Sequence, residues 1–112
     1  MAHFYDIQHK ADEVALNKAI NDYINLPEQI VTYTTKATSE LFNKLSSEKT
    51  VEGVTVTSSG FYGPQGRQLR LKNSTVALGD KLTTFSYEGH KITNFEMESS
   101  ALFALGKAMG HN

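Results

Sequence analysis

The chain has 112 residues, of which 39% are hydrophobic and 10% aromatic, and this is the size and composition of one globular domain. Its 11 basic and 12 acidic residues leave a formal net charge of -1 and no basic stripe, so nucleic-acid binding is not predicted, and the absence of cysteine excludes disulfide and thiolate chemistry. No apolar run approaches the roughly 20 residues that cross a membrane, and no signal-peptide core is present, so we expect a cytoplasmic protein without a membrane partner.

The first part of the chain predicts two helices with a strand between them. Apolar residues at intervals of three and four predict an amphipathic helix over residues 11–25, which Pro27 ends. Residues 30–34 are good strand formers, and residues 36–45 show helical spacing again. The expected buried faces consist of Val14, Leu16, Ala19, Ile20, Tyr23 and Ile24 in the first helix and of Ala37, Leu41, Phe42 and Leu45 in the second.

The central stretch, residues 53–67, reads GVTVTSSGFYGPQGR. Val54 and Val56 alternate with threonines, which predicts a strand with one buried face. Two serines end the strand, and a loop with three glycines and a proline follows. Such a loop can turn sharply and bring its backbone close to a ligand.

The side chains of this loop suit a flat heterocycle with polar edges. Gln65 offers a donor beside an acceptor, which matches a lactam edge, and Arg67 offers donors to a carbonyl oxygen. Phe61 or Tyr62 can stack on the ring face. A pyrimidine dione such as uracil has all three features. The alternative is an ordinary strand and loop whose glutamine and arginine are simply solvated.

The second half predicts a helix, a strand and a final helix. A turn leads into a strand over residues 90–95, and residues 101–109 form an apolar helix that Gly110 ends. The helix before them can be capped by Asn73 or Ser74. Its expected buried face consists of Val76, Leu78, Leu82 and Phe85.

Two carboxylates flank a methionine where this last strand passes into the last helix. The residues are Phe95, Glu96, Met97 and Glu98. In one interpretation the negative charges only complement the dipole of the helix N-terminus. In the other, one carboxylate accepts hydrogen bonds from adjacent sugar hydroxyls while the methionine packs on the apolar face of the sugar.

The segments FYGPQGR and NFEMES, in this order and spacing, resemble the nucleoside phosphorylase family, and in particular its uridine phosphorylases. The resemblance implies an α/β fold of that type, a mixed sheet flanked by helices, incomplete in this chain. It implies that Gln65 and Arg67 hold uracil and that Glu98 accepts hydrogen bonds from ribose hydroxyls. The remaining substrate-binding residues that it implies are Phe61, Phe95, Glu96 and Met97.

The resemblance also implies the reaction. Phosphate attacks the anomeric carbon of uridine, and uracil leaves to give ribose 1-phosphate through a transition state that resembles an oxocarbenium ion. Arg67 would act as the catalytic residue by stabilising the anionic base as it departs. The family uses phosphate as co-substrate, needs no metal and no other cofactor, and forms homo-oligomers.

The chain departs from the family in its length and in its phosphate site. Members are much longer, and their phosphate-binding segments have no counterpart here, since Arg67 and Arg70 are the only arginines. We therefore expect residues 1–112 to form one truncated domain, inactive alone. The alternatives are a purine nucleoside phosphorylase or nucleosidase of the same superfamily, and a non-catalytic nucleoside-binding or interaction module.

Overall fold

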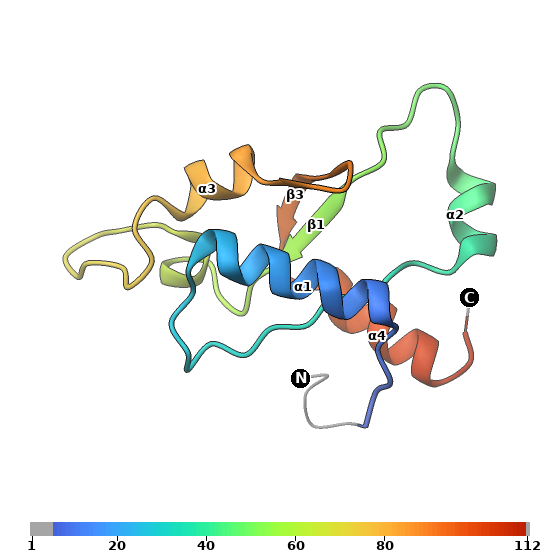
Figure 1. The fold of residues 1–112 in the computed structure, drawn as a ribbon, viewed down its shortest axis with the longest axis horizontal. Helices are drawn as coiled ribbons and strands as arrows, with labels where there is room; N and C mark the ends of the chain where they lie inside the picture. Colours follow the sequence, from blue (N-terminus) through green and yellow to red (C-terminus); the bar gives the residue numbers. More distant parts are fainter. Residues whose placement is uncertain (1–5, 112) are drawn as a thin grey trace.

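The central feature of the fold is a mixed sheet with strand order β1-β3-β2. The computed structural model describes residues 6–111, and within them this sheet is accompanied by four α-helices (Figure 1). Strands β1 (Val54–Thr57) and β3 (His90–Glu96) run parallel, and the short β2 (Ser86–Tyr87) pairs with β3 in an antiparallel hairpin. The predicted α/β class and both predicted strands of the two motifs are confirmed.

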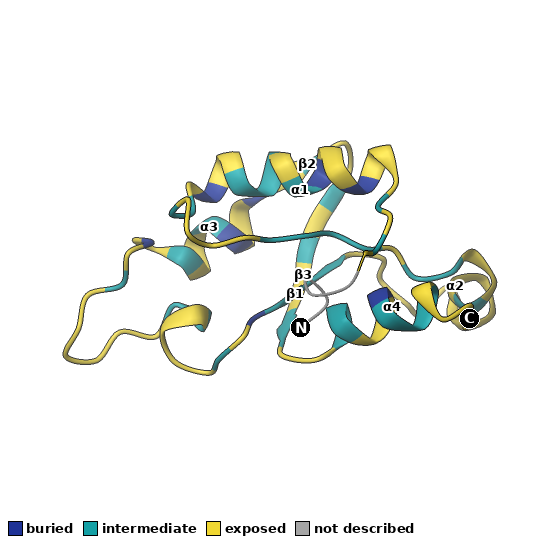
Figure 2. Cartoon of the chain, turned by 90° about the horizontal axis from the view of Figure 1, so that it is seen from below, coloured by how far each residue is buried: buried dark blue, intermediate teal, exposed yellow. Residues whose placement is uncertain are grey.

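The register of β1 and β3 brings the two sequence motifs to one edge of the sheet. Thr57, the last residue of β1, pairs with Glu96, the last residue of β3. Because the strands are parallel, the loop after β1 and the segment after β3 leave the sheet on the same side. Helices α1 (Ala11–Ile24) and α3 (Leu78–Thr84) lie in the upper part of Figure 2 and α4 (Ser99–Ala108) in the lower part.

Helix α1 is confirmed within one residue, but its buried face differs from the predicted one. The helix ends at Asn25, which has a left-handed backbone conformation with φ 57°, a conformation that asparagine tolerates. Leu16 and Ile24 are buried as predicted, whereas Val14 is 58% exposed and Glu13 takes a fully buried position. The predicted buried face is wrong in the first turn of α1, because Glu13, and not the neighbouring Val14, makes the internal contacts there.

The strand predicted for residues 30–34 is wrong. These residues form no strand and pair with none. The segment instead bonds to α1, where the Asn17 side-chain amide donates to the Thr32 carbonyl at 3.2 Å and the Asn21 amide to the Thr32 hydroxyl at 2.7 Å. Ile30 and Val31 favour an extended conformation, but among the described residues no strand pairs with them, so they form no β-ladder.

Helix α2 covers Ser39–Leu45 and is shorter than the predicted helix over residues 36–45. Thr38 caps it by accepting a hydrogen bond from the Leu41 N–H. The backbone N–H of Lys36 donates to the buried Glu13 carboxylate at 2.8 Å, so this residue is held outside the helix. Phe42 and Leu45 are exposed, so the predicted apolar face of α2 is not buried.

Helix α3 begins later than predicted, and Asn73 and Ser74 do not cap it. Its N-cap is Ala77, without a side-chain hydrogen bond. The Asn73 side chain donates instead to the Arg67 carbonyl at 3.3 Å, which makes it part of the preceding loop. Leu82 and Phe85 are buried as predicted, but Val76 is exposed.

Helix α4 (Ser99–Ala108) begins two residues earlier and ends one residue earlier than predicted, and Gly110 stops it as predicted. Gly110 adopts φ 75°, and the N–H groups of Gly110 and His111 donate to the carbonyls of Lys107 and Gly106 at 3.1 Å and 2.8 Å. This pair of bonds is the Schellman motif, for which glycine is the preferred residue.

The apolar core of the described residues is small. Its buried members are Leu16, Ile24, Leu82, Phe85 and Ala104, from α1, the α3 region and α4 (Figure 2). Within residues 6–111 no helix has the length and apolar character that a membrane span requires.

Candidate functional site

The loop after β1 turns back on itself through a single 3₁₀ turn. This turn, η2, covers Gly63–Gln65 and is followed by Gly66, which has φ 78° and donates its N–H to the Gly63 carbonyl at 2.9 Å. A side chain on Gly66 would be strained by this φ and would also meet Leu78 at 3.3 Å. The glycine therefore allows Gln65 and Arg67 to lie close together.

The three residues predicted to bind a base form one cluster. The Arg67 guanidinium lies over the Phe61 ring, with Cζ 3.8 Å from the ring centre, and donates to the Phe61 carbonyl at 2.6 Å. The same nitrogen donates to the Gln65 side-chain oxygen. Tyr62 meets Phe61 edge to face, with ring centres 5.4 Å apart. Because Arg67 donates to the Gln65 oxygen, the Gln65 amide N–H groups and further guanidinium N–H groups are the donors that the pair keeps for a ligand.

The carboxylate of Glu96 lies at the junction of β1, β3 and α4. One of its oxygens accepts the backbone N–H groups of Glu98 and Ser99, each at 2.7 Å. The other accepts the Ser99 hydroxyl at 2.8 Å and the hydroxyl of Thr57. Partial burial opposes ionisation, but the hydrogen bonds from Thr57, Glu98 and Ser99 outweigh it and lower the pKa of Glu96 to about 2.

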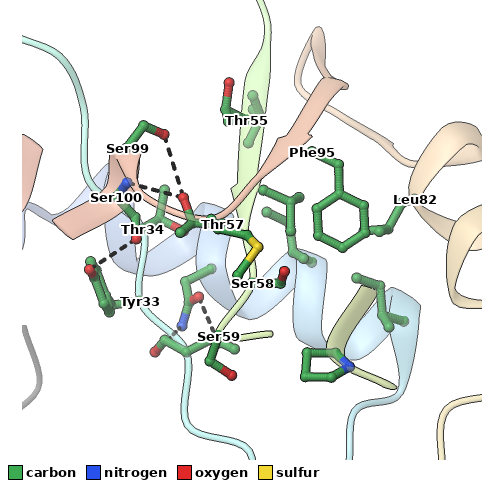
Figure 3. Close-up of a pocket in the computed structure, with 18 of the residues that line it drawn as sticks. Tyr33, Thr34, Thr55, Thr57, Ser58, Ser59, Leu82, Phe95, Ser99 and Ser100 are labelled. Carbon is green, nitrogen blue, oxygen red and sulfur yellow. Dashed lines mark hydrogen bonds between the residues drawn. The ribbon is translucent and has the colours of Figure 1, made fainter. Parts of the chain in front are cut away.

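Glu98 has a different environment from Glu96, although only one residue separates them. It occupies the N-cap position of α4 and is exposed, and no hydrogen bond or ion pair of its carboxylate is found in the described part of the chain. Met97 is also exposed, and Phe95 is half-buried, with its ring directed toward Leu82 (Figure 3).

A broad groove joins the two motifs. It lies beside β1 and is lined by segments that include α1, residues 30–37, the loop after β1 and the first turns of α4. Of the predicted site residues, Arg67, Phe95, Met97 and Glu98 line it. Phe61, Gln65 and Glu96 do not line it, but Phe61 and Gln65 bond to Arg67, and Glu96 bonds to the backbone of Glu98. The groove runs along β1 from Glu52 to Ser59 and reaches the carboxyl ends of the parallel strands, where open α/β sheets commonly bind ligands.

Sequence reasoning missed a group of hydroxyls in this groove. Figure 3 shows Thr57, Ser99 and Ser100 connected by hydrogen bonds, with the Ser100 N–H donating to the Thr57 hydroxyl at 3.0 Å. The Tyr33 hydroxyl donates to the Ser100 hydroxyl at 3.1 Å. Single serines and threonines carry no sequence signal of this kind, because the parallel pairing of β1 and β3 is what brings them together.

A second missed residue is Glu13, which lies outside the groove. Its carboxylate accepts the backbone N–H groups of Lys10 and Lys36, both at 2.8 Å, and the Lys107 ammonium at 2.7 Å. Burial opposes its ionisation, but these donors outweigh the burial and keep the pKa of Glu13 below its usual range. Its position in the first turn of a helix indicates capping, but nothing in the sequence indicates a contact with Lys107.

Within residues 6–111, no group of three or more His, Asp or Glu side chains is placed to hold a metal ion. Comparison of the chain with protein-family models, with curated proteins and with solved structures gives no match.

Proposed function

We propose that the groove binds a pyrimidine nucleoside and that the chain carries the base and ribose parts of a uridine phosphorylase site. The observation that carries the proposal is the meeting of two motifs at one sheet edge. The Phe61, Gln65 and Arg67 cluster follows β1, Met97 and Glu98 follow the parallel β3, and members of both sets line one groove. A nucleoside needs one set of side chains that binds its base and a second, adjacent set that binds its sugar.

The base would lie against the donors of Gln65 and Arg67. In phosphorolysis of uridine, negative charge develops on the uracil carbonyl oxygens as the bond to the sugar breaks. The Arg67 guanidinium is held in place by the Phe61 ring and carbonyl, so its charge is already oriented. An oriented cation favours the departing anion over the neutral base, which lowers the barrier for its departure.

The sugar would lie against Glu98 and Met97. The 2′ and 3′ hydroxyls of ribose are adjacent, and the exposed Glu98 carboxylate can accept a hydrogen bond from each of them. The thioether of Met97 can cover the apolar face of the ring. Together they would hold the sugar while phosphate approaches the anomeric carbon, and the products would be uracil and ribose 1-phosphate.

A second candidate is a nucleoside-binding module without turnover. It is favoured because backbone amides at the N-terminus of α4 already donate to acceptors within the chain. Free amides at a helix N-terminus would offer a phosphate site. Here Glu96 accepts the N–H groups of Glu98 and Ser99, and Thr57 accepts that of Ser100. These amides are therefore not free for phosphate, and catalysis requires phosphate-binding groups from outside the two motifs.

The resemblance to the superfamily also implies a homo-oligomer. The compartment that we expect for it is the cytoplasm.

The proposal is tested by the change in ultraviolet absorbance when the chain is mixed with uridine and phosphate. Loss of turnover in Gln65→Ala would place base recognition at Gln65, and phosphate dependence would distinguish phosphorolysis from hydrolysis. No turnover, together with binding of uridine, would favour the binding module.

A comparison of uridine with inosine separates pyrimidine from purine recognition. The proposal predicts that uridine binds at least about tenfold more tightly, because uracil presents two carbonyl oxygens to the donors of Gln65 and Arg67, whereas the base of inosine presents one. Tighter binding of inosine would contradict the pyrimidine assignment and favour a purine nucleoside phosphorylase or nucleosidase.

A further inference from the structure

The two carboxylates of the Glu96–Met97–Glu98 stretch are divided between an internal and an external role. A carboxylate has about four acceptor sites. Those of Glu96 are occupied by the backbone N–H groups of Glu98 and Ser99 and by the hydroxyls of Thr57 and Ser99. A sugar hydroxyl could bind Glu96 only by displacing one of these donors.

The bonds of Glu96 join two segments that are far apart in the sequence. Thr57 ends β1 and directly precedes the loop with Phe61, Gln65 and Arg67, whereas Glu98 and Ser99 begin α4. Thr57 also accepts the N–H of Ser100 at 3.0 Å, and the Ser58 N–H donates to the Glu96 carbonyl at 2.9 Å. The Glu96 carboxylate is thus at the centre of the connection between the two motifs.

We propose that Glu96 is a positioning residue, whose carboxylate fixes the start of α4 against the end of β1 and so holds Glu98 in the groove for a sugar. This inference rests on the proposed function for the identity of the ligand, and on the hydrogen bonds alone for the fixed position of Glu98. Glu96 then acts on the ligand through Glu98 and does not touch it.

Amide hydrogen exchange of the full chain without ligand tests the fixed position. In Glu96→Ala, both acceptor oxygens are removed, so protection of the Glu98 and Ser99 amides is expected to fall about tenfold. Thr57→Val is expected to expose the Ser100 amide by a similar factor. The matched control is Thr55→Val, the same change on the same strand, which should leave these amides unchanged because Thr55 bonds to none of them.

Uridine and uracil binding to the same variants tests the action through Glu98. Glu96→Ala is expected to weaken uridine binding about tenfold and uracil binding less than twofold, since uracil has no sugar to contact Glu98. If Glu96 acts through Glu98, the double variant Glu96→Ala, Glu98→Gln binds uridine within about twofold of Glu98→Gln alone. Additive losses would indicate a direct sugar contact and overturn the proposal.

The two arms separate failure of the inference from failure of the proposed function. Unchanged exchange of the Glu98 and Ser99 amides in Glu96→Ala overturns the positioning role, whether or not the chain binds uridine. Absence of uridine binding in the unaltered chain overturns the proposed function, and the exchange rates then still decide whether Glu96 fixes the start of α4.

Discussion

At the scale of single residues, the site depends on which polar groups are already bonded and which are free to meet a ligand. Glu96 and the oxygen of Gln65 are occupied by internal donors, whereas the carboxylate of Glu98 is exposed. Arg67 combines an internal role with an external one, because its guanidinium is planar, can lie on an aromatic ring and still offers further donors.

The pH dependence of Glu96 follows from its hydrogen bonds. Its pKa of about 2 in the folded chain lies below the ordinary value of 4.5, so its bonds stabilise the fold fully above pH 4.5. This contribution is lost as the pH falls from about 4.5 toward 2. Carbon-detected NMR titration of the glutamate carboxyls should show the midpoint of Glu96 near 2, and a midpoint near 4.5 would contradict the described geometry.

Arg67→Lys keeps the positive charge but removes the planar group that lies on Phe61 and bonds two acceptors. We expect uracil affinity to fall about tenfold, since an ammonium is not oriented by the ring and cannot make the same paired bonds. Arg70→Lys, in the same loop region, is the matched control and should leave the affinity unchanged. Isothermal titration with uracil measures both, and equal affinities for the two variants would exclude the proposed role of Arg67.

At the scale of elements, Glu13 connects α1, the segment before α2 and α4. Replacing this carboxylate by an amide removes the charge that faces the Lys107 ammonium, and it turns one of the two acceptor oxygens into an NH₂ group that faces donors. Glu13→Gln should therefore lower the free energy of unfolding by about 3 kcal/mol. Asp12→Asn removes the exposed pair with Lys36, which water screens, so its cost should be much smaller than that of Glu13→Gln. Urea denaturation compares them, and similar costs for both variants would contradict a structural role for Glu13.

The same elements show what the sequence can and cannot predict. Period-two alternation found β1 and β3, and helical spacing found α1 and α4, because these patterns depend on local geometry. The position of Arg67 and Glu98 along one groove follows from parallel pairing, which the βαβ order favours. The irregular path of residues 30–34 and the burial of Glu13 depend on tertiary contacts with α1 and α4 that leave no local pattern.

At the scale of the whole molecule, the chain exposes more surface than its mass requires. Its accessible surface is 8482 Å², whereas a compact monomer of 12.4 kDa has about 6,100 Å². The large apolar side chains that remain exposed include Val31, Leu69, Leu71 and Leu102, all of which line the groove. Within residues 6–111, strand β1 also lies at the edge of the sheet, with one side unpaired.

This surface predicts self-association of the chain. The excess, on the order of 2,000 Å² per chain, is comparable to what an obligate dimer interface buries. A second copy that pairs with the edge of β1 would cover part of it, and Val56→Lys on that strand should weaken the pairing. Sedimentation velocity at micromolar concentration should show a dimer or larger species, and a stable compact monomer would contradict the prediction.

The central claim is that one ligand contacts both motifs in one groove. The most direct test is titration of the isotope-labelled chain with uridine, followed through its backbone amide resonances. We predict saturable shifts at residues 61–67 and at residues 95–100, with the same dissociation constant for both sets. Shifts confined to one set, or shifts that do not saturate, would contradict a shared nucleoside site.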